Sequence, residues 1–237
     1  MMKFASLFII DAISANLMSP TVQNAWMATA PQEMLDAFAT SDAGRKFSGA
    51  LANTINGLNE YACWCFFNDD HGRGKGKALD GLDETCKVLH DGYECAMRDA
   101  EEEGRTCVPW EVDYNPSGLF ATDIGEDCQI QNPNSNCAAR ACAVEGAFVA
   151  NMLDFFIGGG ILNDDYRQSN GFNFDEECGT KGTGKASVSA KACCGKYPDR
   201  FPFKTLDGDR ACCGARTYNA LSLKCCDSSA SEVKFNC

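Results

Sequence analysis

The stretch LDETCKVLHDGY, residues 82–93, decides how this chain is expected to fold. Apolar side chains recur at helical spacing from Leu82 to Met97, so the sequence predicts an amphipathic helix over about residues 80–100. His90 and Asp91 are neighbours in this helix, and neighbouring helical side chains point about 100° apart. One of the two can therefore face a partner helix while the other faces a loop.

A second helix is predicted from Cys137 to Phe156, where apolar residues form one stripe and residues 158–160, all glycine, end the pattern. The stripe consists of Ala141, Val144, Phe148, Met152 and Phe155. Glu145 lies at its edge, where a carboxylate needs a partner such as an imidazole. The two predicted helices are the expected framework of the protein.

The remaining chain falls into segments of different composition. Residues 1–15 are expected to be a signal peptide, with a retained N-terminal assembly segment as the alternative. Residues 16–60 are expected to be helical and residues 61–178 to form the main domain. Residues 105–136 are rich in turn residues and predict loops and a short strand pair. Residues 179–192 have linker composition, and residues 193–237 form a cysteine-rich tail.

The chain holds 16 cysteines, which favours a disulfide framework and an extracellular location. Zinc is the weaker alternative, because there are only 2 histidines and no paired Cys-x-x-Cys ligand motifs. Nine cysteines lie between Cys63 and Cys178 and seven between Cys193 and Cys237. Two odd numbers cannot both pair internally, so full pairing requires at least one disulfide between the two regions.

The chain is strongly acidic, with 33 acidic against 21 basic side chains and a formal net charge of -12. Such a surface repels phosphate backbones and anionic headgroups, which argues against nucleic-acid binding and against electrostatic docking on a membrane. We expect the partner to be cationic, neutral or another copy of the chain.

The motif YACWC (61–65), followed by the helix with Cys86, His90, Asp91 and Tyr93, resembles the secreted phospholipase A2 family. In that family a Cys-x-Cys calcium loop precedes a helix with an acidic start, a cysteine and a His-Asp pair. A second helix then carries a Cys-x4-Cys spacing and a carboxylate. Cys137 and Cys142 have this spacing here, and Glu145 takes the place of the family's aspartate. The resemblance covers about residues 45–178.

The resemblance implies a mainly α, disulfide-rich fold built on an antiparallel two-helix platform. It implies that His90 is the general base for hydrolysis of the phospholipid sn-2 ester and that Glu145 orients its imidazole. It also implies a Ca²⁺ site at Asp91 and the loop carbonyls. The family's geometry further implies the disulfides Cys65–Cys86 and Cys95–Cys142.

The loop after Cys65 departs from the family pattern. In the stretch Cys65-Phe66-Phe67-Asn68, phenylalanine and asparagine stand where the family has its first glycines, and three basic residues alternate with the later glycines over residues 72–77. We expect any calcium site to be redesigned around Asp91, Asp69 and Asp70, with Trp64 as the loop residue; the alternative is that Asp69 and Asp70 are simply solvated. His90 is then either a catalytic base or a structural residue bonded to Glu145. Trp64, Phe66 and Phe67 predict either a lipid-binding rim or core packing.

The tail contains three adjacent cysteine pairs, which begin at Cys193, Cys212 and Cys225. It resembles the galaxin-type dicysteine repeats of extracellular matrix proteins. Adjacent cysteines bond each other only with strain, so each pair is expected to join two different neighbours and to crosslink small β-hairpins. An aromatic stretch, Tyr197–Phe203, is expected to pack on the first domain or on another molecule.

These observations leave two hypotheses for function. The favoured one is a secreted structural protein of a matrix, coat or filament, which binds itself or other extracellular matrix proteins and is catalytically impaired. The alternative is a Ca²⁺-dependent secreted phospholipase A2.

Overall fold

The computed structural model describes residues 58–67, 73–115, 117, 123–179 and 191–237. The predictions for residues 1–57 and for Asp69 and Asp70 lie outside this set, as does most of the predicted linker. The chain divides into two compact units, Met1–Lys87 with Phe148–Thr180 and Val88–Ala147 with Lys181–Cys237. The division falls within the two long helices.

Both predicted long helices are confirmed. The first is α5, Gly81–Glu102, and the second is α7, Asn136–Ile157, which ends directly before the glycine run. The turn-rich segment between them contains a short helix, α6, Ile124–Gln131, where loops and a strand pair were predicted. Asp123 caps α6 by accepting a hydrogen bond from the N–H of Glu126, a local signal that the turn residues around it obscure.

The first unit is held by disulfides at both ends of its Cys-x-Cys segment. Cys63 bonds Cys178 directly after the short helix α8, Phe174–Glu177, and Cys65 bonds Cys86 on α5. The second of these is the bridge that the family resemblance implies, and it is confirmed. Phe66 is buried against Phe174, with ring centroids 5.0 Å apart and nearly perpendicular planes. Phe66 and Phe67 are both buried. The prediction of core packing is therefore confirmed for these two residues, and the prediction of a lipid-binding rim is wrong for them.

In the second unit, α5 and α7 run antiparallel. Gly92 packs against Val144, while Glu103 binds Asn136 and Arg140 at the start of α7. A Cβ atom at Gly92 would lie 2.7 Å from both methyl carbons of Val144. Only a residue without a side chain therefore allows this separation of the two helices.

The disulfides of the second unit correct one prediction. Cys95 bonds Cys193 of the tail, and Cys142 bonds Cys128 on α6, so the implied bridge Cys95–Cys142 is wrong. The sequence gives α7 a local cysteine partner in a helix that was not expected, which leaves Cys95 available to the tail. The Cys95–Cys193 bond is the disulfide that the two odd cysteine counts require.

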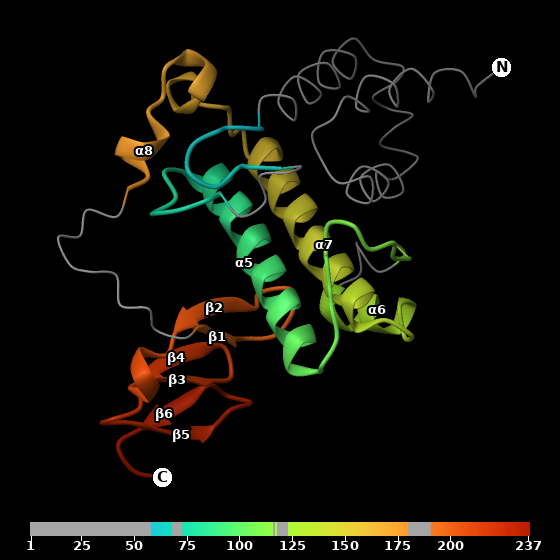
Figure 1. The fold of residues 1–237 in the computed structure, drawn as a ribbon, viewed down its shortest axis with the longest axis vertical. Coiled ribbons are helices and arrows are strands. Elements are labelled where there is room, and N and C mark those ends of the chain that lie inside the picture. Colours follow the sequence, from blue (N-terminus) through green and yellow to red (C-terminus); the bar gives the residue numbers. More distant parts are fainter. Residues whose placement is uncertain (1–57, 68–72, 116, 118–122, 180–190) are drawn as a thin grey trace. The chain divides into compact units, whose positions relative to one another are not determined.

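The tail consists of three antiparallel hairpins, as predicted (Figure 1). They are β1–β2 (Lys191–Cys194 and Phe201–Lys204), β3–β4 (Arg210–Cys213 and Arg216–Asn219) and β5–β6 (Lys224–Asp227 and Glu232–Lys234). Every adjacent cysteine pair bonds two different partners, also as predicted. The bonds Cys194–Cys212 and Cys213–Cys225 join each hairpin to the next, and Cys226–Cys237 secures the end of the chain.

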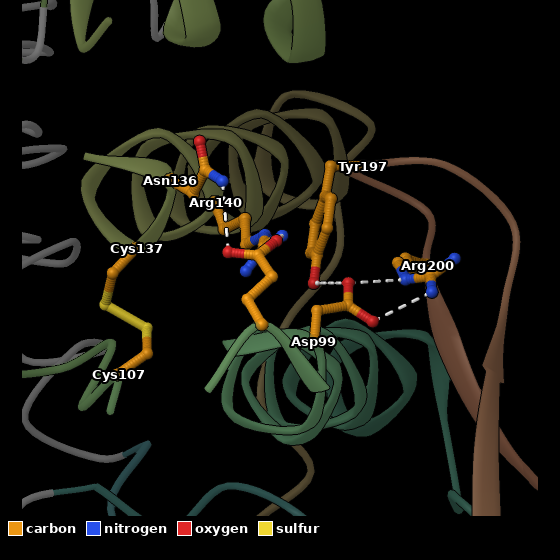
Figure 2. Close-up of polar contacts among 8 residues, drawn as sticks. Asp99, Cys107, Asn136, Cys137, Arg140, Tyr197 and Arg200 are labelled. Atoms are coloured by element: carbon orange, nitrogen blue, oxygen red, sulfur yellow. Dashed lines mark hydrogen bonds and ion pairs between the residues drawn. A yellow bond between two sulfur atoms is a disulfide. The ribbon is translucent and has the colours of Figure 1, made fainter. Parts of the chain in front are cut away.

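The first hairpin packs on α5 through the aromatic stretch of the tail (Figure 2). Arg200 donates two hydrogen bonds of 2.8 Å to the two carboxylate oxygens of Asp99, and the Tyr197 hydroxyl donates another of 2.8 Å. The guanidinium groups of Arg140 and Arg200 each lie 5.9 Å from the centre of the Tyr197 ring. The aromatic stretch was predicted to pack either on the first domain or on another molecule. Tyr197 packs on the helices of the same chain, as the first of these predictions states.

Candidate functional site

The chemically most distinctive group of the second unit is the Glu145 carboxylate, which is fully buried on α7. Tyr93 of α5 donates a hydrogen bond of 2.6 Å to Oε1, and Tyr114 donates one of 2.5 Å to Oε2. Burying a carboxylate is costly unless it is hydrogen-bonded, and each oxygen here has a short bond from a hydroxyl. Three segments of the chain thus converge on one acid.

The electrostatics of this cluster keep both tyrosines protonated. Burial raises the pKa of Tyr93 and of Tyr114, and the negative charge of Glu145 raises both further. A phenol that bonds a carboxylate cannot ionise without placing two negative charges side by side. Both hydroxyls therefore remain hydrogen-bond donors over the physiological pH range.

The structure brings His90 and Glu145 to the same tyrosine. The imidazole of His90 lies edge-on to the Tyr93 ring with a centroid distance of 6.4 Å, and the Tyr93 hydroxyl binds Glu145. His90 and Asp91 are both half-buried on α5, so the pair is neither fully enclosed nor fully solvated. An imidazole beside a buried carboxylate network can take part in general acid–base chemistry.

Tyr114 is the residue of the site that the sequence did not indicate. It lies in an irregular segment without any hydrophobic period, so no pattern marks it. Its position depends on backbone contacts of the next residue: the N–H of Asn115 donates to the side chain of Asn132 at 2.7 Å, and the Asn132 amide donates back to the Asn115 carbonyl at 3.2 Å. The disulfides Cys107–Cys137 and Cys128–Cys142 tie the surrounding segment to α7.

In the first unit, Asp83 holds the Cys-x-Cys segment against the start of α5. Its buried carboxylate accepts hydrogen bonds from the N–H groups of Cys63, Trp64 and Leu79. Burial raises the pKa of Asp83 to about 6, although the three N–H groups act in the opposite direction. Asp80 caps α5 by accepting a hydrogen bond of 2.8 Å from the N–H of Asp83, so the Asp83 carboxylate remains available to fix the backbone of the predicted calcium loop.

The described part of that loop does not supply a complete calcium site. The carbonyl of Trp64 accepts a hydrogen bond from the N–H of Phe66, and the Trp64 indole donates to the Gly76 carbonyl at 3.3 Å. Asp91 is the only predicted carboxylate ligand within the described residues, whereas Ca²⁺ takes six to eight oxygens. Those residues also contain no group of three or more His, Cys, Asp or Glu side chains arranged to hold a metal.

No protein-family model, curated protein or solved structure matches this chain. Among the described residues, no helix is both long and apolar enough to cross a membrane.

Proposed function

We propose that the protein is a secreted ester hydrolase of the phospholipase A2 type, with His90 as general base. The observation that carries the proposal is the fully buried Glu145 with a tyrosine hydroxyl on each oxygen, next to the tyrosine that contacts His90. A purely structural protein has little need for this cluster, because an apolar replacement of a buried charged group is often neutral or stabilising. This evidence favours the hydrolase over the structural role that the sequence alone suggests.

The residues of the chain have distinct tasks in the proposed reaction. His90 accepts a proton from water as the water oxygen attacks the ester carbonyl, and it returns that proton to the alcohol when the carbon–oxygen bond breaks. The negative charge of Glu145 favours the imidazolium that forms in between. Tyr93 and Tyr114 hold the carboxylate in place and prevent it from turning away.

The proposal is tested with the full-length oxidised protein and a dispersed short-chain phosphatidylcholine. His90→Asn and Glu145→Gln are expected to lose nearly all hydrolysis, since a positioned base contributes roughly 100- to 10,000-fold to a rate. His71→Asn, which changes the only other histidine, is the matched control and is expected to retain activity. A chelator arm measures the contribution of Ca²⁺ separately. Activity that is absent in the native protein, or unchanged in His90→Asn, would refute the hydrolase.

One observation favours a second function, that of a durable structural subunit. The tail forms a chain of hairpins in which two disulfides join each hairpin to the next and a third secures the end of the chain. Such crosslinks constrain the unfolded chain and replace a large hydrophobic core. A structural subunit is expected to form concentration-dependent oligomers with itself or with extracellular matrix proteins. Light scattering that shows only monomers at every concentration, together with hydrolysis, would eliminate this candidate.

A further inference from the structure

The formal charge of this acidic chain is distributed unevenly. Residues 191–237 carry eight basic and five acidic side chains, a formal charge of +3, which leaves -15 on the preceding residues. The overall charge of -12 therefore hides a basic tail. At physiological ionic strength charges are screened beyond about 8 Å. A partner close to the tail therefore responds to the positive charge of the tail and not to the net charge of the whole chain.

The hairpin topology gathers part of this charge at one end of the tail. Residues 205–209 connect β2 to β3 and residues 220–223 connect β4 to β5, and both connections lie at the strand ends opposite the tight turns. β3 lies next to both β1 and β5. The turns are stacked, since the N–H of Gly195 donates to the Gly214 carbonyl at 3.0 Å. The other ends must then lie together, and we call them the connecting-loop end: Lys191, residues 204–210, residues 219–224, and residues 234–235.

The connecting-loop end combines cations with exposed apolar side chains. It carries five basic and two acidic residues, whereas the turn end (residues 195–200, 214–216 and 227–232) carries three of each. Leu206, Leu221 and Phe235 are 44%, 75% and 73% exposed, and all three lie at the connecting-loop end. Each of them is within four residues of an exposed Lys or Arg.

The strand register places like charges opposite each other in two of the three hairpins. Lys191 lies directly opposite Lys204, and Lys224 lies directly opposite Lys234. Like charges at directly opposed positions destabilise a hairpin. Lys191 is paired with Glu94 at 2.8 Å and Lys234 with Glu232 at 2.5 Å, whereas Lys204 and Lys224 are exposed and present their charge to solvent.

The connecting-loop end lies toward the start of α5, which is also the direction in which His90 of the candidate site lies. Lys191 binds Glu94, while Arg200 at the turn end binds Asp99, so the first hairpin follows α5 with its connecting-loop end toward the start of the helix. His90 precedes Glu94 by one helical turn, about 6 Å. A surface bound at the connecting-loop end would therefore lie nearer to His90 than a surface bound at the turn end.

From this placement we propose that the connecting-loop end of the tail docks the protein on the surface of an anionic lipid bilayer. Lys204, Arg210, Lys224 and Lys234 contact the headgroups, and Leu206, Leu221 and Phe235 enter the interface below them, as amphipathic surface segments do. The inference rests on the proposed function in one respect, since docking would bring the hydrolytic site to its phospholipid substrate.

Docking is tested by vesicle flotation of the full-length oxidised protein with chelator present, on phosphatidylcholine vesicles with and without phosphatidylserine. Binding is expected only with phosphatidylserine and should weaken with salt. Lys204→Gln/Lys224→Gln is expected to weaken it roughly 30-fold. The matched variant Lys196→Gln/Arg216→Gln removes two exposed cations of the turn end and should bind like the native protein.

The apolar component has its own variant pair. Leu221→Ser/Phe235→Ser is expected to lose binding, while Ile130→Ser/Ile161→Ser, which changes equally exposed residues elsewhere, is expected to keep it. Equal loss in both charge variants, or sedimentation of the protein as oligomers without vesicles, would overturn the proposal; the second outcome would point to an acidic surface of another copy as the partner. Hydrolysis of the dispersed ester needs no bilayer, so failure of docking and failure of the hydrolase are read separately.

Discussion

Tyr114 and Glu145 are joined by a hydrogen bond of 2.5 Å between a loop without sequence pattern and a fully buried position of α7. The bond gives the irregular segment a fixed position relative to the helices, and it gives the carboxylate its second donor. A site that the helix pattern alone describes as a pair of facing residues is therefore a network of three elements.

Tyr114→Phe is expected to lower the free energy of unfolding by about 1.5–3 kcal/mol, because a buried carboxylate loses one of its hydroxyl donors. Chemical denaturation at neutral pH measures the change. Tyr218→Phe in β4 is the control and should change stability by less than about 0.5 kcal/mol. Equal effects of the two substitutions would show that the Tyr114 hydroxyl contributes nothing specific.

Four tyrosines are expected to resist ionisation at alkaline pH. Burial, and then a neighbouring carboxylate, raises the pKa of Tyr61, Tyr93, Tyr114 and Tyr197 above the ordinary value of 10.0. Each of these tyrosines has a higher pKa in the folded state than in the unfolded state. Its contribution to the free energy of unfolding is therefore complete below about pH 10 and is lost as the pH rises beyond that value. Phenolate absorbance should therefore appear in two steps, the second together with unfolding. A single step for all tyrosines near pH 10 would contradict this.

The contact between the tail and α5 is expected to weaken in acid. Burial acts to raise the pKa of Glu94, but hydrogen bonds from Lys191 and Arg98 outweigh it and lower the pKa below 4.5. Stability from this group is present above the ordinary pKa and is lost as the pH falls through the lowered one. Glu94→Gln should flatten the acid limb of the stability–pH curve, measured by urea unfolding. An unchanged limb in the variant would exclude Glu94 as its source.

Gly92→Ala is expected to destabilise the protein by about 1–3 kcal/mol through overpacking against Val144, even though alanine favours a helix by about 1 kcal/mol. Thermal unfolding of the single variant and of Gly92→Ala/Val144→Ala measures this, and the second substitution should restore part of the loss. Gly81→Ala is the control, because a Cβ atom there lies 3.8 Å from Phe155, an ordinary contact. A neutral Gly92→Ala would mean that the helices separate without cost.

The sequence by itself determined the elements whose signal is local. Helical periodicity placed α5 and α7, and the glycine run marked the end of α7. The odd cysteine counts required a disulfide between the tail and the main domain, and the strain of adjacent pairing predicted that each dicysteine pair would join different neighbours. These properties follow from the spacing of residues and from whether the number of cysteines in a region is odd or even, and both can be read from the sequence without a structure.

Only the tertiary structure decided which partners meet. Cys95 bonds Cys193 and not Cys142, because the unexpected helix α6 brings Cys128 to Cys142. Tyr114 reaches Glu145 from a segment without any period, and three hairpins gather cations and apolar side chains that are spread along the chain from Lys191 to Phe235. Contacts of this kind depend on the three-dimensional path of loops, whose turn residues are compatible with many paths until distant disulfides and helices select one.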